Sequence, residues 1–268
     1  MATGLLETMP HLTVAGETVH YVHRQSRRPA SPALVFIHGA GGSHQLWLYQ
    51  VRGLPHVTSF AIDLPGHGHS AGQGRDRVAA YADWLIAFLD AAGLEQAALV
   101  GHSMGGAIAL DIALRYRERV AGLILVATGA RLRVAPAILD GLRHDPTVTI
   151  RLIAEWCYCP QVPPGLMRLA EQQMAATSPD VVYRDFAACD AFDVTDRLGE
   201  VAVPTAVVCG TEDRMTPPKY AAYLCDKISG AALHLIEGAG HMVMLEKPEE
   251  VTAILATDLP FKTGDLKL

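Results

Sequence analysis

The sequence predicts an α/β fold with a mostly parallel sheet and helices on both faces. Short apolar runs that end in Gly or Asp alternate with segments of helical pattern, first over residues 33–127 and again over residues 205–255. The stretch between these two parts contains no run typical of a buried strand. At 268 residues, half of them apolar, the chain is long enough for one large domain with an insertion.

Each predicted element follows from its local pattern. Alternation over residues 11–24, with Gly16 at a turn, predicts a hairpin. Apolar runs predict strands at residues 33–37, 57–62, 97–100, 120–127, 205–209 and 232–236. Helical patterns predict helices at residues 76–92, 105–116, 217–228 and 248–255.

Residues 131–198 form the predicted insertion. They leave the sheet after the strand at 120–127 and return before the strand at 205–209, so we expect a helical cap over one end of the sheet. The predicted division is a core of residues 1–130 and 199–268 and a cap of residues 131–198. Proline residues break the helical pattern of the cap at Pro136, Pro146, Pro160, Pro163, Pro164 and Pro179.

Composition excludes several classes of protein. A net charge of -6 without any Lys/Arg-rich run argues against nucleic-acid binding. No apolar run approaches the length that spans a bilayer, and Met1 to Pro10 lacks the basic and apolar regions of a signal peptide. Five cysteines, all past mid-chain, disfavour a disulfide framework. We therefore expect a cytoplasmic protein that is a monomer or homodimer.

The pattern G-x-S-x-G occurs twice, around Ser70 and around Ser103. A nucleophilic serine of this pattern needs a sharp strand-to-helix turn that lifts its hydroxyl out of the sheet edge. Ser103 follows the apolar run at 97–100 directly, and Gly105 opens a helix. A loop rich in Pro and Gly separates Ser70 from its strand. Ser103 is therefore the predicted nucleophile, and Ser70 is an ordinary loop serine.

A serine hydroxyl needs a neighbouring base, which an acid then orients. On this type of sheet the three follow in the chain order Ser, Asp or Glu, His. Of the 12 histidines only His234 and His241 lie beyond Asp213, and His234 falls inside an apolar run. His241 on the loop past that run is the predicted base. Asp213, after the strand at 205–209, is the predicted acid, with Glu212 as the alternative.

Residues 38–42, His-Gly-Ala-Gly-Gly, follow the strand at 33–37. The backbone N–H groups of Ala40 and of Met104 are the predicted donors to a developing oxyanion. Neither G-x-G-x-x-G nor Gly-Lys-Ser/Thr accompanies the loop, which disfavours phosphate binding. The Cys157-x-Cys159 pair has no second pair at zinc-ligand spacing, so we expect no metal and no cofactor.

Together these segments resemble the α/β-hydrolase family in its capped, serine-esterase-like branch. The likeness covers residues 35–130 and 204–251 and implies a mostly parallel sheet of eight strands and a reaction without cofactor. Relatives that open epoxides or remove halides carry Asp where this chain has Ser103. The matching segments are His38-Gly39-Ala40-Gly41-Gly42, Asp63-Leu64-Pro65-Gly66-His67-Gly68-His69-Ser70, Gly101-His102-Ser103-Met104-Gly105-Gly106, Gly210-Thr211-Glu212-Asp213 and Gly240-His241.

The resemblance implies hydrolysis of small-molecule carboxylic esters with small to medium acyl chains through an acyl-enzyme. A lactonase, a thioesterase, a C–C bond hydrolase and an acyltransferase of the same fold stay open, and a non-catalytic ligand receptor is the alternative from another class. Six large side chains of the cap are candidates to line the acyl pocket, and Trp156 and Phe192 are the two predicted to do so. The other four candidates are Tyr158, Met167, Met174 and Phe186.

Overall fold

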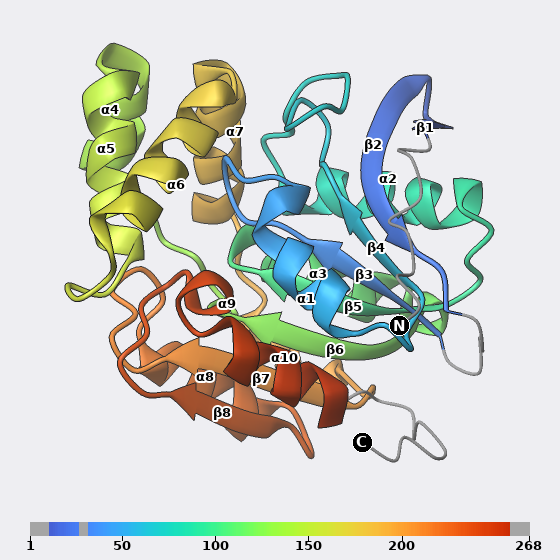
Figure 1. Cartoon of the computed structure of the whole chain (residues 1–268). Coiled ribbons are helices and arrows are strands. Elements are labelled where there is room, and N and C mark those ends of the chain that lie inside the picture. The colour runs from blue at the N-terminus through green and yellow to red at the C-terminus, as the bar shows by residue number, and fades with distance from the viewer. Residues whose placement is uncertain (1–10, 27–31, 258–268) are drawn as a thin grey trace, which may run out of the picture.

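The computed structural model describes residues 11–26 and 32–257, and one sheet of eight strands forms its centre (Figure 1). The strand order is β1-β2-β4-β3-β5-β6-β7-β8. The strands are β1 (His11–Val14), β2 (Glu17–Arg24), β3 (Ala33–Ile37), β4 (Ser59–Ile62), β5 (Ala97–His102), β6 (Val120–Val126), β7 (Thr205–Gly210) and β8 (Ala232–Ile236).

The sheet is mostly parallel, as the sequence predicts. β1 and β2 form the predicted antiparallel hairpin, and β2 pairs antiparallel with β4. Every pair from β4 to β8 is parallel. The carboxyl ends of β3 to β8 therefore meet at one edge, where loops from separate strands can bring side chains together.

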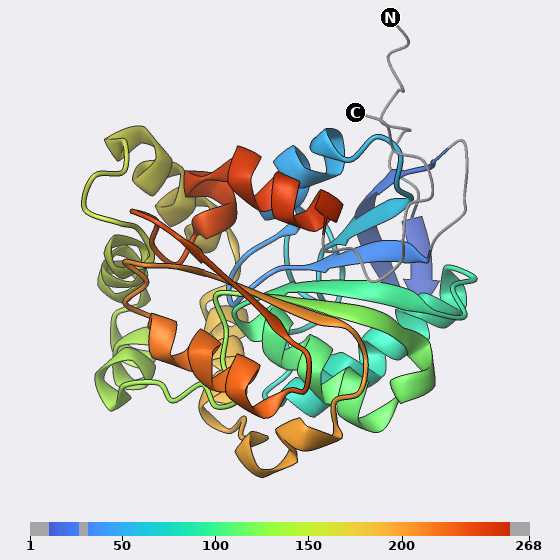
Figure 2. The same ribbon diagram turned by 90° about the horizontal axis from the view of Figure 1, so that it is seen from below.

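Helices cover both faces of the sheet (Figure 2). On one side lie α1 (Leu48–Gly53) and α10 (Pro248–Thr257), and on the other α2 (Val78–Ala91), α3 (Met104–Arg115) and α8 (Pro218–Lys227). β3 shows why both layers form: Leu34 and Phe36 belong to one apolar core, and Val35 and Ile37 belong to the other. Successive strand residues point to opposite faces, so an unbroken apolar run needs a cover on each.

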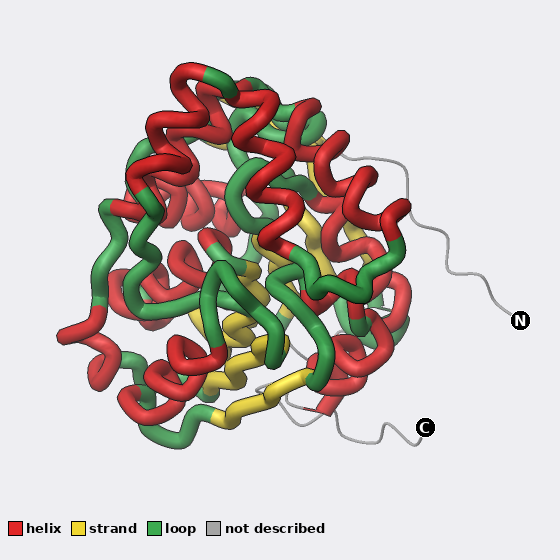
Figure 3. Tube along the Cα trace, turned by 90° about the vertical axis from the view of Figure 1, so that its left-hand side faces the viewer, coloured by secondary structure: helices red, strands yellow, loops and turns green. Residues whose placement is uncertain are grey.

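Four helices lie between β6 and β7, within residues 131–198, which we call the insertion. They are α4 (Pro136–His144), α5 (Pro146–Cys157), α6 (Pro164–Ala176) and α7 (Pro179–Asp190). Each begins with its proline in the first turn, where the missing N–H costs nothing. Four of the six prolines thus start helices. Figures 1 and 3 show these helices gathered beyond one edge of the sheet.

Some elements differ from the sequence predictions. The 3-10 helix His44–Trp47, α1 and the short α9 (Val243–Glu246) were not predicted, because each is too short to show a helical period. The predicted strand at 232–236 is present as β8, which is an edge strand with Leu233 and Leu235 39% and 49% exposed.

Three further predictions concern the whole chain. Within the described ranges, no helix is both long enough and apolar enough to cross a bilayer. All five cysteines lie within those ranges, and each carries a free thiol. The proposed lack of a signal peptide in Met1 to Pro10 lies outside the described residues.

Candidate active site

Ser103 occupies the sharp turn between β5 and α3. Its backbone has φ 52° and ψ −115°, a conformation that L-residues rarely adopt. Such a conformation costs on the order of 1–3 kcal/mol and persists only where the surrounding structure fixes it. Here the Ser103 N–H donates to Val126 at 2.9 Å, and the Ser103 carbonyl accepts from the Thr128 hydroxyl at 2.7 Å. The turn is therefore held from the neighbouring strand.

Glycine is required on both sides of this turn, because neighbouring backbone atoms leave no space for a Cβ. A Cβ on Gly101 would lie 2.3 Å from the carbonyl oxygen of Gly105. A Cβ on Gly105 would lie 2.4 Å from the carbonyl oxygen of Ile37. The two glycines of the pattern thus let β5, the start of α3 and the end of β3 pack against one another.

His241 and Asp213 form a buried pair at the same edge. The His241 Nδ1 lies 2.9 Å from Asp213 Oδ2 and 3.2 Å from Oδ1. Because a carboxylate only accepts, Nδ1 carries a proton, and in the neutral ring Nε2 then keeps a lone pair. The backbone N–H and the hydroxyl of Thr216 donate to the same carboxylate at 2.8 Å each. Asp213 is thereby fixed, whereas the alternative acid Glu212 is exposed.

The charge of the pair follows from these contacts. Burial alone would raise the pKa of the Asp213 carboxyl, but His241 and the hydrogen bonds from Thr216 hold this pKa below its ordinary value. The carboxylate therefore stays ionised at neutral pH and orients the imidazole.

Ser103 and His241 line one cavity, and the insertion supplies half of the residues around it. Ser103 is partly exposed, and the cavity volume is about 100 Å³. Among the described residues no direct hydrogen bond joins the Ser103 hydroxyl to the His241 ring, and such bonds often tighten only when substrate binds. Apolar side chains dominate the lining, among them Leu132, Ile153, Met174, Phe186 and Met215.

The predicted pocket residues Trp156 and Phe192 are corrected by the structure, because neither lines this cavity. Trp156 is 40% exposed on α5, whereas Ile153 and Cys157 of the same helix are buried. Phe192 is buried in the apolar core on the α2 and α3 side of the sheet. Phe186 is the aromatic residue of the insertion that lines the cavity, together with Tyr158.

The loop at residues 38–42 also borders the cavity. The Gly42 N–H closes a turn onto the Gly39 carbonyl at 3.1 Å, and Gly41 takes φ +64° within it. No acceptor takes the Ala40 N–H within the part of the chain that the structure describes. Met104 is the first residue of α3, where backbone N–H groups have no partner inside the helix. Both predicted oxyanion donors thus belong to segments that border the cavity.

His102, beside Ser103, is a site residue that was not predicted. Its Nε2 lies 3.1 Å from the His241 carbonyl oxygen and donates to it, and the two rings lie 4.7 Å apart. Burial, with His241 nearby, holds the pKa of His102 well below its ordinary value, so the ring is neutral. The neutral ring connects the loop of the base to the turn of the nucleophile.

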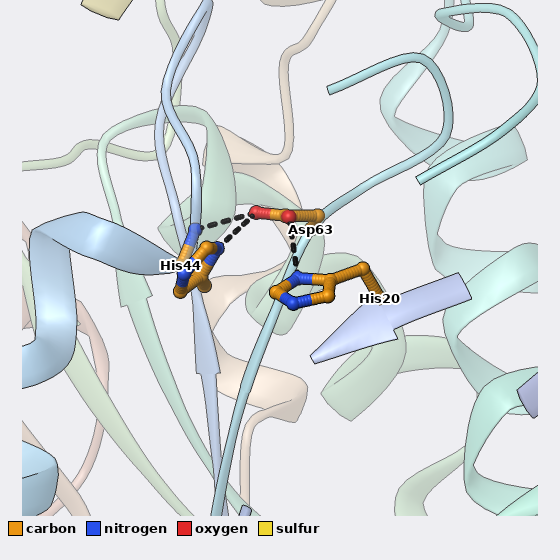
Figure 4. Close-up of side chains that lie close together, drawn as sticks. All are labelled: His20, His44 and Asp63. Atoms are coloured by element: carbon orange, nitrogen blue, oxygen red, sulfur yellow. Dashed lines mark hydrogen bonds and ion pairs between the residues drawn. The ribbon is translucent and has the colours of Figure 1, made fainter. Parts of the chain in front are cut away.

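Three buried residues could together hold a metal ion: His20, His44 and Asp63, with ligand atoms within 4.8 Å of one another (Figure 4). In the structure both rings are instead hydrogen-bonded to the carboxylate at 2.9 Å. Asp63 also accepts the backbone N–H groups of His44 and His69. Its oxygens are thus engaged in holding the loop that contains Ser70.

Comparisons with known proteins agree with this architecture. The model of the "Alpha/beta hydrolase family" matches residues 34–254. A pimeloyl-[acyl-carrier protein] methyl ester esterase of Neisseria meningitidis serogroup B is 29% identical over 87% of this chain and 96% of its own. A 2-hydroxy-6-oxo-6-phenylhexa-2,4-dienoate hydrolase of Comamonas testosteroni is 29% identical over 81% of this chain and 84% of its own.

Among solved structures, a thermophilic esterase is 32% identical to this chain. It superimposes with a TM-score of 0.81 and covers 93% of this chain and 96% of its own.

Proposed function

The chain belongs to the alpha/beta hydrolase family, and from this premise we propose that it is a serine hydrolase that cleaves carboxylic esters of small to medium acyl chain. The observation that supports this proposal is the strained turn at Ser103, which borders the same cavity as a His241 ring oriented by a buried carboxylate. Esterases among the relatives and the solved structures support it independently.

In the proposed mechanism His241 Nε2 takes the proton of the Ser103 hydroxyl as its oxygen attacks the ester carbonyl. Collapse of the tetrahedral intermediate breaks the C–O bond, and His241 returns the proton to the departing alcohol. Water then attacks the acyl-enzyme with His241 as base, which releases the acid and restores Ser103. Asp213 keeps the imidazole in the required tautomer and stabilises its charged form.

The negative charge on the carbonyl oxygen is stabilised by the backbone N–H groups of Ala40 and Met104. Donors that are fixed before reaction act without reorganisation, and one of them is worth about 10²- to 10³-fold in kcat. The glycine-rich turn around Ala40 and the first turn of α3 supply such fixed groups.

We further propose that residues 131–198 act as a cap that selects the acyl group. The insertion supplies half of the residues around the cavity, and most of those side chains are apolar. An apolar enclosure excludes water and favours an uncharged acyl chain.

The test is a hydrolysis panel of esters, thioesters, lactones and amides with graded acyl length, together with a dienoate of the kind named for the Comamonas relative. The proposal predicts the highest kcat/KM on an ester. A preference for the dienoate would favour C–C bond cleavage, and tight binding without turnover of any compound would favour a receptor.

Substitutions in the insertion test the cap with a matched control. Phe186→Ala should change the ranking of acyl lengths, with about 1–3 kcal/mol of altered discrimination, because it enlarges the cavity. Trp156→Ala should leave the ranking unchanged, because that side chain lies on the outer face of α5. Equal profiles for both variants and the wild type would contradict the assignment of the cavity.

A further inference from the structure

Asp185 of α7 is a carboxylate with no exposed surface, although it lies on the insertion. Its Oδ2 accepts the Gly41 N–H at 2.8 Å and a hydrogen from His67 Nε2 at 2.7 Å. Its Oδ1 accepts the Tyr81 hydroxyl. One side chain thus joins α7 to the loop at residues 38–42, to the loop after β4 and to α2.

The partners of Asp185 hold its side chain in one position. His67 also directs Nδ1 at the Pro65 carbonyl, 3.0 Å away, so both ring nitrogens face acceptors and the ring is an imidazolium. Burial alone would lower the pKa of His67, but the charge of Asp185 and the hydrogen bonds to Asp185 and to the Pro65 carbonyl together outweigh burial, so the pKa is raised. A buried ion pair with each partner hydrogen-bonded keeps a single geometry.

The contact with Gly41 matters because Gly41 follows Ala40. Gly41 takes φ +64°, and the insertion approaches it so closely that a Cβ there would lie 2.9 Å from Met174 Cγ. On its other side the Gly41 carbonyl accepts the Thr177 hydroxyl at 3.5 Å. The insertion therefore holds both polar groups of the residue next to the proposed oxyanion donor.

We propose that Asp185 is a positioning residue that fixes the oxyanion loop from the insertion. This inference rests on the proposed function, in which Ala40 stabilises the oxyanion. Asp185 does not touch the reacting atoms; it orients the Ala40–Gly41 backbone by accepting the Gly41 N–H. The insertion thereby takes part in the chemistry as well as in the choice of the acyl chain.

The test compares Asp185→Asn and Asp185→Ala with Asp180→Asn, which removes an exposed carboxylate from the same helix. We expect both Asp185 variants to lower kcat by about 10- to 100-fold with less than about a threefold change in KM, since misplacing an oxyanion donor acts mainly in the transition state. The inhibition constant of a trifluoromethyl ketone analogue of the substrate should rise by the same factor. That of the product acid should stay within about twofold, and Asp180→Asn should match the wild type throughout.

A second readout does not depend on activity. Amide hydrogen exchange of the peptide that covers residues 38–46 should be faster in Asp185→Asn than in the wild type and in Asp180→Asn. Slow exchange in all three proteins would overturn the proposal even if the chain were not an esterase. If the wild type neither hydrolyses esters nor binds the ketone while exchange changes as expected, the proposed function fails and the positioning contact stands.

Folding defects are covered by a milder variant. Tyr81→Phe removes one hydrogen bond from Asp185 Oδ1 and leaves the Gly41 contact. If neither Asp185 variant folds, Tyr81→Phe should still lower kcat by about threefold or more and accelerate exchange at residues 38–46. Unchanged kcat, ketone inhibition and exchange in Tyr81→Phe together with any folded Asp185 variant would show a purely structural role.

Discussion

Ser70 and Ser103 stand in the same G-x-S-x-G pattern, yet the fold uses them in opposite ways. Ser103 sits at positive φ directly after a buried strand and borders the cavity. The Ser70 hydroxyl is taken up by the backbone: it accepts the His20 N–H at 2.9 Å and donates to the Asp63 carbonyl at 2.8 Å. Ser103 thus borders the cavity, whereas the Ser70 hydroxyl links its loop to β2.

The difference lies in what surrounds each pattern. Gly101 and Gly105 permit close backbone contacts that force the turn at Ser103. Near Ser70, Gly68 is needed for another reason: a Cβ there would lie 2.2 Å from Asp63 Oδ2. The glycines of the two G-x-S-x-G copies therefore serve different ends: they permit a strained turn at Ser103 and make room for the buried Asp63 carboxylate near Ser70.

The largest expected effect is at Ser103. Ser103→Ala should lower kcat by about 10³-fold or more without changing the melting transition greatly, because the nucleophile is lost and little packing is removed. Steady-state kinetics and circular dichroism would check this. Near-normal turnover in this variant would remove the basis of the comparison.

A smaller loss of kcat is expected when Asp213 is changed, the acid for which Ser70 has no counterpart. Asp213→Asn should lower kcat by at least about 10²-fold, because the neutral amide no longer holds His241 in its productive tautomer. Glu212→Gln, an exposed neighbour, is the matched control and should keep wild-type kcat. The opposite ranking in steady-state assays would make Glu212 the acid.

Ser70→Ala should act on stability alone. It leaves the His20 N–H and the Asp63 carbonyl without this partner, which should lower the free energy of unfolding by about 1–3 kcal/mol in denaturant titrations. Its kcat should stay within about twofold of the wild type. A loss of activity with unchanged stability would mean that Ser70 takes part in catalysis.

The smallest effect concerns pH and the ion pair beside the Ser70 loop. The raised pKa of His67 contributes stability that is fully present below the unfolded value near 6.5 and is lost as the pH rises through the folded value. Asp185→Asn removes this contribution to stability. The other titratable groups near His67, among them His38 and Asp63, are present in both proteins and do not cause a difference between them. The difference in unfolding free energy between wild type and variant should therefore shrink from pH 6 toward pH 9. A difference that grows over this range would exclude a charged His67.

Sequence reasoning predicted the placement of the three loops, because placement follows from local order. Ser103, Asp213 and His241 each follow a strand, and parallel strands end at one edge, so chain order alone brings their loops together. The fold class followed from the same alternation. His102 could have been noticed as the neighbour of Ser103, but nothing in the sequence indicates that its ring meets the His241 carbonyl.

Sequence reasoning failed to identify the residues that line the cavity, because these depend on how a helix is oriented in the fold. Ile153 and Cys157 face the cavity from α5, whereas Trp156 faces out with Val148 and Leu152, which are 59% and 37% exposed. Both faces are apolar, so periodicity does not distinguish them. Asp185 shows the same difficulty, because its partner Gly41 lies 144 residues away in the chain.

The most direct test of the account is covalent labelling with a fluorophosphonate, read by intact mass and peptide mapping, on the wild type, Ser70→Ala and Ser103→Ala. Because the turn at Ser103 and the His241–Asp213 pair activate one hydroxyl, we predict a single adduct on Ser103 in the wild type and in Ser70→Ala, and none in Ser103→Ala. An adduct on Ser70, or undiminished labelling of Ser103→Ala, would contradict the central claim.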